Sequence, residues 1–217
     1  MTASGPRGGR PRDPAADETI LQATRRQLVK QGYARMTVAD VAADAGVTRP
    51  TIYRRWPDKL TLVSDALNYG FVNQRAAYNW ADDEKTPFER FRELVRRTDP
   101  CFADPNGLVL EADLMAETNR TPELLQLLAE RAVEPRTGPL EALLTQLKED
   151  GAIRPDTDER TTATMILGAF FGAHLRTDHT DHTDHTDHTD HTDHTDRTVA
   201  DQIATEAWAG LRYSTKP

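Results

Sequence analysis

TVADVAADAGVTRPTIYRRWPDK, residues 37–59, is the stretch that decides the fold. Thr37 can cap a short helix over residues 38–45, because threonine is a favoured N-cap residue. Gly46 stops this helix, since glycine readily adopts the left-handed backbone of a tight turn. Thr48 can cap a second short helix. The stretch therefore predicts two short helices joined by a glycine turn.

The apolar residues of this stretch fall where two crossed helices must meet. Ala42 is small enough to let the helices cross closely. Val41, Val47 and Ile52 are the aliphatic residues that would lock the two helices together. Pro57 ends the second helix, because the residue before a proline is biased away from the α conformation. This register is typical of a helix-turn-helix. The alternative is a generic helical hairpin with a solvated charged face.

Helical patterns continue on both sides. Asp17 is expected to cap a helix that Gly32 ends, and Asp58 to begin a longer helix toward Trp80. Later segments repeat apolar residues at helical spacing, with Pro135 and Pro139 expected to kink or interrupt one of them. No strand-like alternation of any length occurs. The sequence predicts an all-α protein.

Charge is distributed unevenly along the chain. Residues 1–60 hold eleven Lys and Arg against six Asp and Glu, a net of +5. The remaining chain holds sixteen against twenty-nine, a net of −13, and the two parts sum to the total of −8. A basic head on an acidic body indicates a polyanionic partner for the head. No signal peptide and no apolar run of membrane length is visible, so we expect a cytoplasmic protein without a membrane partner.

The segment TVADVAADAGVTRPTIYRRWPDKLTLVSDAL resembles the DNA-binding domain of TetR-family transcriptional repressors, most specifically in GVTRPTIYRRWPDK. The resemblance is close over about residues 17–66 and looser beyond. It implies three N-terminal helices for DNA at 17–62 and a larger C-terminal helical domain for ligand binding and dimerisation at 63–217. Residues 1–16 are rich in Gly, Pro and Arg, and this composition predicts a flexible basic arm. The resemblance also implies a homodimeric repressor that a small-molecule effector releases from a palindromic operator in double-stranded DNA.

The resemblance assigns DNA contacts by position. The exposed residues of the second helix by themselves favour Thr48, Arg49, Thr51 and Arg54 for base edges or phosphates, and Tyr53 and Lys59 for phosphates. Trp56 is expected to pack, and its indole is a further candidate for a phosphate contact. GRPR in the arm is a candidate for an adjacent minor groove, or else a tail that adds nonspecific attraction. The predicted DNA-binding residues are Thr37, Thr48, Arg49, Pro50, Thr51, Tyr53, Arg54 and Lys59.

Small residues at helical spacing mark the last two helices, which in the family pair with their mates in a four-helix bundle. The alternative for this stripe is a helix pair within one chain. The predicted dimer residues are Gly168, Gly172, Ala204, Ala207, Trp208 and Leu211. For an effector pocket the candidates are apolar and aromatic residues, most of which would equally suit a core. They are Trp80, Phe88, Phe91, Leu114, Met115, Phe170, Phe171 and His174.

A Thr-Asp-His repeat at 177–197 is expected to be a disordered loop between the last two helices, since it contains nothing apolar. Its imidazoles and carboxylates could bind metal weakly or respond to pH. The rival function is therefore a metal- or pH-responsive regulator, or a metal-buffering protein. No cofactor and no defined metal site is predicted. An enzyme is not expected, because the sequence shows no catalytic constellation and Cys101 has no histidine near it in the chain.

Overall fold

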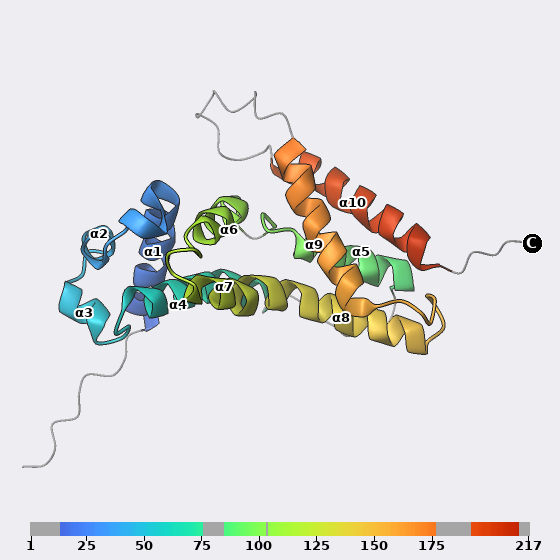
Figure 1. The fold of residues 1–217 in the computed structure, drawn as a ribbon, viewed down its shortest axis with the longest axis horizontal. Helices are drawn as coiled ribbons and strands as arrows, with labels where there is room; N and C mark the ends of the chain where they lie inside the picture. Colours follow the sequence, from blue (N-terminus) through green and yellow to red (C-terminus); the bar gives the residue numbers. More distant parts are fainter. Residues whose placement is uncertain (1–13, 76–84, 103, 177–191, 213–217) are drawn as a thin grey trace, which may run out of the picture. The chain divides into compact units, whose positions relative to one another are not determined.

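The computed structural model describes residues 14–75, 85–102, 104–176 and 192–212. Every regular element in these ranges is helical, as predicted (Figure 1). None of these helices is long and apolar enough to cross a bilayer. In chain order the elements are α1 (Pro14–Arg35), α2 (Val38–Asp44), α3 (Arg49–Tyr53), α4 (Lys59–Arg75), α5 (Pro87–Thr98), α6 (Gly107–Ala116), α7 (Glu123–Leu128), the π-helical turn η1 (Ala129–Val133), α8 (Glu134–Glu149), α9 (Glu159–Arg176) and α10 (Thr192–Leu211).

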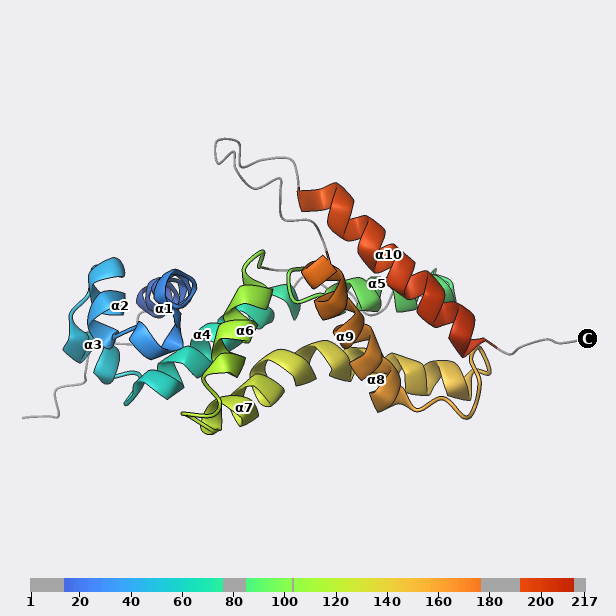
Figure 2. The same ribbon diagram turned by 45° about the horizontal axis from the view of Figure 1, so that its top comes forward.

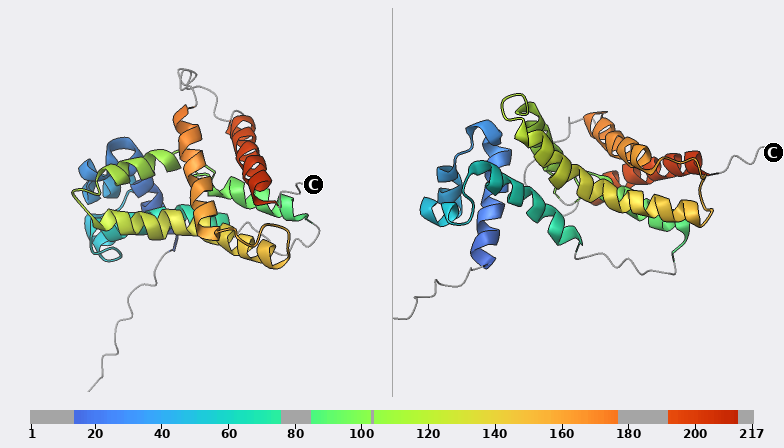
Figure 3. Two further views of the ribbon diagram at one scale, coloured as in Figure 1. Left: turned by 45° about the vertical axis from the view of Figure 1, so that its right-hand side comes forward. Right: turned by 60° about the horizontal axis from the view of Figure 1, so that its bottom comes forward.

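The chain forms two compact units, one up to Tyr69 and one from Gly70. The first unit contains α1, α2, α3 and the start of α4 (Figure 3). Arg25 ties α1 to α4 through a 3.0 Å hydrogen bond to the carbonyl of Ala66. Burial of aliphatic side chains from all four helices stabilises this small unit. Its fully buried side chains include Ile20, Leu28, Met36, Ile52 and Leu62.

The second unit packs α5, α8, α9 and α10 around one apolar core. Helix α10 lies along α5 and α9, while α8 packs against α5 and α9 on the other side (Figure 2). Trp208 of α10 covers two phenylalanines of α5, with ring centroids 5.6 Å from Phe88 and 5.2 Å from Phe91. The buried residues of this core include Phe91, Leu144, Ile166, Phe170 and Ala204.

The first helix differs from its predicted bounds at its start. It already runs from Pro14, so Asp17 is not its N-cap but lies in its first turn. Both residues suit that place, since proline fits the first turn and a carboxylate there faces the positive end of the helix dipole. At the other end, Gly32 leaves the helical conformation, with φ 75° and ψ 165°, so it ends the first helical stretch as predicted; a short second stretch follows it and runs up to Arg35.

The two prolines expected to kink or interrupt a helix differ in their effect. Pro135 lies at the start of α8, directly after a π-helical turn that interrupts the regular α-helix, as predicted, whereas Pro139 lies inside α8 without ending it. Helix α10 begins at Thr192, inside the repeat, so the end of the segment expected as loop is helical. Extending a helix backwards from an apolar segment is easier than nucleating one, because each added residue gains a hydrogen bond. Residues 177–191 of the repeat lie outside the described ranges, as does the basic arm up to residue 13.

Candidate nucleic-acid interface

Close packing fixes the angle between α2 and α3. Val41 and Ile52 are fully buried, and Ala42 is 5% exposed where the two helices meet. Gly46 adopts φ +65° in the turn between them, which is a left-handed conformation that glycine adopts without a Cβ penalty. The amide of Val47 then donates a 2.9 Å hydrogen bond to the carbonyl of Ala42. The packing that the sequence predicted for this motif is therefore present.

Helix α2 starts with a reciprocal cap. The hydroxyl oxygen of Thr37 accepts from the amide of Asp40 at 3.2 Å, and the Thr37 amide donates to the Asp40 carboxylate at 3.0 Å. This capping box satisfies two amides that the first turn would otherwise leave without partners. The hydrogen bonds from the Thr37 side chain and backbone lower the pKa of the Asp40 carboxyl. Thr37 thus caps the N-terminus of α2 while its side chain remains exposed to solvent.

The N-cap of α3 differs in detail from expectation. Thr48 occupies the N-cap position, but its side chain makes no capping hydrogen bond. Its hydroxyl instead lies 2.9 Å from the hydroxyl of Thr51, which also accepts from Arg54 at 3.3 Å. Hydrogen bonds therefore link three predicted DNA contacts, from the N-cap Thr48 through Thr51 to the C-cap Arg54.

Helix α3 presents its remaining predicted contacts to solvent. Arg49, Pro50 and Arg54 are exposed, and Tyr53 is 51% exposed although it is a large aromatic residue. Ile52, between them in the chain, points into the core. The helix therefore separates one buried anchor from a face that carries two guanidinium groups and a phenol, which suits contact with phosphates and base edges.

Lys59 and Trp56 make internal bonds. The Lys59 ammonium donates to the carbonyls of Tyr33 at 2.5 Å and Met36 at 3.1 Å, and it lies 4.1 Å from the Tyr33 ring centroid. An ammonium has three donors, so a phosphate contact by Lys59 stays a prediction alongside this bracing role. The indole N–H of Trp56 donates to Asp65 at 2.8 Å, and the residue is 4% exposed. Trp56 packs as expected, but its indole N–H is directed to a carboxylate rather than outward.

Sequence reasoning missed one brace of α3. Arg55 forms an ion pair with Asp17 of α1 and donates to the carbonyl of Thr51 at 3.2 Å. No spacing rule relates the two charged residues, because they come together only through the tertiary packing of α1. A similar contact links Arg26 of α1 to Asp44 of α2 at 3.2 Å, and its hydrogen bond is the main cause of the lowered pKa of the Asp44 carboxyl.

The predicted effector residues are dispersed through the second unit. Phe91, Leu114 and Phe170 are buried, Phe88, Phe171 and His174 are partly buried, and Met115 is 54% exposed. Phe88, Phe91 and Phe170 belong to the apolar core of the second unit. Trp80 lies outside the described residues. The predicted pocket lining therefore remains a hypothesis for most of these residues, and Met115 points to the surface of this chain.

The predicted dimer residues fall into two groups. Ala204 and Leu211 of α10 are buried in the core of their own chain, and Trp208 packs on Phe88 and Phe91 of α5. Ala207 is partly buried against the same core, so Ala204 and Leu211 make contacts within one chain while the dimer assignment of the stripe stays a prediction. Gly168 and Gly172 of α9 are exposed. They lie on the same helix as the exposed Met165 and Leu175.

The geometry of α2 and α3 defines a helix-turn-helix protein, and comparison with known proteins agrees. Residues 20–66 match the family model of bacterial regulatory proteins of the tetR family. Residues 82–204 match the tetracyclin repressor-like C-terminal domain. The two models together span most of the chain. The first lies within the first compact unit and the second within the second unit.

Individual relatives lead to the same class. An uncharacterised HTH-type transcriptional regulator of Mycobacterium tuberculosis, Rv1556, is 32% identical over 148 residues, which are 66% of this chain and 70% of the relative. Among solved structures, the transcriptional regulator FadR from Bacillus subtilis in complex with stearoyl-CoA is similar with a TM-score of 0.68 and 17% identity, over 90% of this chain and 99% of that one. A TetR-family regulator from Rhodococcus gives a TM-score of 0.64 at 18% identity, over 91% and 98%.

The chain belongs to the TetR family of bacterial regulatory proteins. It is a DNA-binding transcriptional regulator of the helix-turn-helix type.

Proposed function

We propose that this regulator is a homodimeric, cytoplasmic repressor that binds a palindromic operator and is released from it by a small-molecule effector. Helix α3 enters the major groove, and the α3 of a second copy enters the next groove on the same face. A two-fold dimer requires such a symmetric site, because its two recognition helices are related by the same axis.

The observation that carries the DNA-binding part is the exposed face of α3. Arg49, Tyr53 and Arg54 point to solvent from a helix whose backbone is held by the buried Ile52. Arg55 and Asp17 fix the same helix to α1. A guanidinium group on a rigid helix can read a guanine through two hydrogen bonds or contact a phosphate. Thr37, Thr48, Pro50, Thr51 and Lys59 are proposed as accompanying contacts.

The dimer and effector parts rest on the second unit. Helix α9 exposes Met165 and Leu175, at 70% and 77%, together with Gly168 and Gly172. Small residues allow close helix contact, and exposed apolar residues gain from being covered. The similarity of this unit to a tetracyclin repressor-like domain, and of the fold to a regulator solved with stearoyl-CoA, supports a small-molecule effector.

The test compares two arginine substitutions in the purified full-length protein. We expect Arg49→Ala to weaken binding to a selected operator by roughly 5- to 150-fold, the range for loss of a base contact worth about 1–3 kcal/mol. Arg160→Ala is the matched control, because it removes the same charge from an exposed position on α9. Equal affinities for both variants and the wild type would contradict a role for α3. A repressor must also lower transcription in vitro from a promoter that contains the operator, and an increase would refute that sign of regulation.

A further inference from the structure

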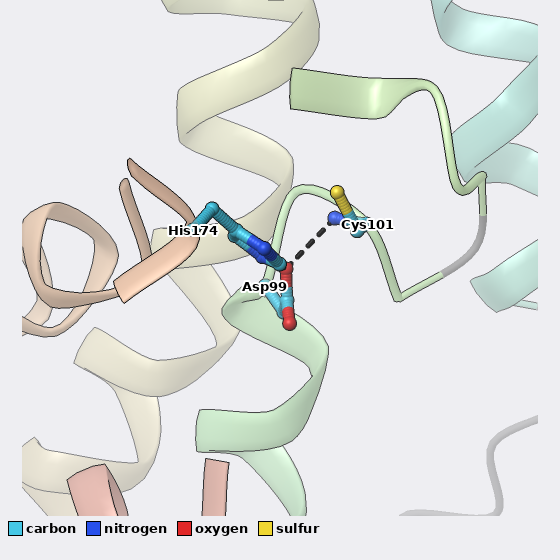
Figure 4. A group of neighbouring side chains, drawn as sticks. All are labelled: Asp99, Cys101 and His174. Carbon is cyan, nitrogen blue, oxygen red and sulfur yellow. Dashed lines mark hydrogen bonds and ion pairs between the residues drawn. The ribbon is translucent and has the colours of Figure 1, made fainter. Parts of the chain in front are cut away.

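Three side chains with metal-ligating atoms meet in the second unit. Asp99 follows α5, Cys101 comes two residues later, and His174 lies in the last turn of α9 (Figure 4). One ligand atom from each lies within 4.8 Å of those of the other two. Asp99 is 5% exposed, and the other two residues are partly buried. Asp99 and His174 are 75 positions apart, so only the fold brings them together.

The Asp99 carboxylate organises this cluster. Its Oδ1 lies 2.8 Å from Nε2 of His174 and accepts a 2.8 Å hydrogen bond from the backbone amide of Cys101. The chain leaves the helical conformation at Asp99, with ψ 124°, and the amide of Phe102 donates back to the Asp99 carbonyl at 3.1 Å. The turn therefore holds the cysteine next to the carboxylate.

A buried ion pair contacts the turn through the carbonyl of Pro100. Arg136 of α8 and Glu111 of α6 form an ion pair at 2.6 Å, with side chains 4% and 7% exposed. Arg136 also donates to the carbonyl of Ala132 at 3.2 Å and reaches the carbonyl of Pro100 at 3.5 Å. Ala132 belongs to the π-helical turn, a feature often found at functional sites.

Gly107, the first residue of α6, lies directly against the carbonyl group of Pro100. A Cβ placed on Gly107 would lie 2.0 Å from the carbonyl oxygen of Pro100. No real Cβ tolerates that distance from a backbone atom, so only glycine fits here without a shift of the turn. The peptide between Asp99 and Cys101 is thus held between α6 and α8, which makes the cluster preorganised.

We propose that Asp99, Cys101 and His174 form a binding site for a divalent transition-metal ion of the zinc class. A thiolate, an imidazole and a carboxylate are ligands that zinc accepts, usually in tetrahedral coordination. Magnesium and calcium are disfavoured because they prefer oxygen ligands alone. Three protein ligands leave the fourth position to water or another small molecule, which is the pattern of an open zinc site.

The distances require only small movements. In a tetrahedral site with metal–ligand bonds of about 2.0–2.3 Å, ligand atoms lie roughly 3.3–3.6 Å apart. The 2.8 Å separation between His174 and Asp99 must open by about 0.5 Å, and a separation near the 4.8 Å limit must close by about 1 Å. Binding releases the thiol proton of Cys101 to solvent. The imidazole binds the metal in its neutral form, with its one proton on the nitrogen that does not face the metal, and any other ring proton is released to solvent.

Sulfur distinguishes this site from the histidine repeat. Six of the seven histidines of the chain belong to the repeat, and they supply nitrogen ligands only. Cys101 is the single cysteine. A metal–thiolate bond within one chain therefore reports on Cys101 and on no other residue, even in the full-length protein.

The experiment is a titration of the reduced, full-length protein with Co²⁺, followed by near-ultraviolet absorption. We expect a cobalt–thiolate charge-transfer band that saturates at one equivalent per chain and disappears on addition of Zn²⁺. His174→Asn and Asp99→Asn should each weaken Co²⁺ binding at this band by at least about 10-fold, because ligands and their partners both contribute to affinity. Cys101→Ser should abolish the band.

The matched control is a variant in which the six repeat histidines, at 179, 182, 185, 188, 191 and 194, are changed to asparagine; it should keep the band and its affinity. Absence of the band in the wild type overturns the proposal. A band that is unchanged in His174→Asn, or that saturates at one cobalt per two chains, overturns it as well, because the thiolate then binds without this site. If circular dichroism shows that Cys101→Ser does not fold, the Co²⁺ affinities of His174→Asn and Asp99→Asn still test the proposal.

Discussion

Breaking the buried pair between Glu111 and Arg136 should destabilise the second unit strongly. Arg136 lies 2.6 Å from Glu111, and neither side chain is more than 7% exposed. In Arg136→Met the carboxylate of Glu111 loses this guanidinium in a buried place, and the carbonyls of Ala132 and Pro100 lose a donor. Removing one partner of such a pair typically costs about 3–5 kcal/mol. We expect a loss of that size in the free energy of unfolding.

The double variant Glu111→Leu with Arg136→Met separates pairing from packing. It removes both charges and keeps side chains of similar volume, so much of the lost stability should return, to within about 1–2 kcal/mol of the wild type. Arg120→Met is the control, because its pair with Glu117 involves an arginine side chain that is 77% exposed. Surface pairs of this kind contribute between about 0 and 1 kcal/mol.

Urea unfolding followed by circular dichroism gives these free energies, provided that the slope with denaturant is the same for every variant. A cost below about 1 kcal/mol for Arg136→Met would refute the reasoning that the pair is buried and mutually dependent. A double variant whose loss of stability equals or exceeds the sum of the losses in Arg136→Met and Glu111→Leu alone would refute it too, since it would show that the two charges do not stabilise each other.

Two further predictions concern the helix-turn-helix. Gly46→Ala should destabilise the first unit by about 1–2 kcal/mol, because the residue adopts φ +65° although no atom lies near the place of a Cβ. Gly138→Ala inside α8 should instead stabilise the protein by about 0.5–1 kcal/mol, because alanine has the higher helix propensity. Thermal unfolding measures both effects, and equal shifts in the unfolding temperature would contradict the argument. The lowered pKa of Asp40 means that its capping bonds stabilise α2 above the ordinary carboxyl pKa of 3.8 and are lost as pH falls through the lower folded value. The stability difference between the wild type and Thr37→Ala should therefore shrink at acidic pH, and a constant difference would count against the capping box.

The fold was predictable where local rules decide it. Ala42, Gly46 and Ile52 occupy spaced positions whose sizes match a close helix crossing, so the motif could be read from the chain. The start of α1 was misjudged because Pro14 and Asp17 each fit a helix beginning, and local preference could not choose between them. The start of α10 was misjudged because composition describes a segment alone, while the helix continues from its apolar neighbour.

The site residues also divide into those that local rules predict and those that depend on tertiary packing. The exposed face of α3 follows from helical periodicity, since residues flanking a buried Ile52 must face outward. The ion pair of Asp17 with Arg55 and the meeting of Cys101 with His174 depend on tertiary packing between distant segments. The separation of the dimer stripe into buried and exposed members also required the structure, because Ala204 is as small as a contact residue needs to be and yet fills the core of its own chain.

The most direct test of the central claim is selection of fragmented genomic DNA from the source organism by the purified full-length protein, followed by sequencing of the bound fragments. The account predicts one enriched palindromic motif, with half-sites separated by about one helical turn of 10–10.5 base pairs or a multiple of it. Its enrichment should fall in Arg49→Ala and be kept in Arg160→Ala. Weak, salt-labile binding without any shared motif would contradict the claim that α3 reads a specific operator.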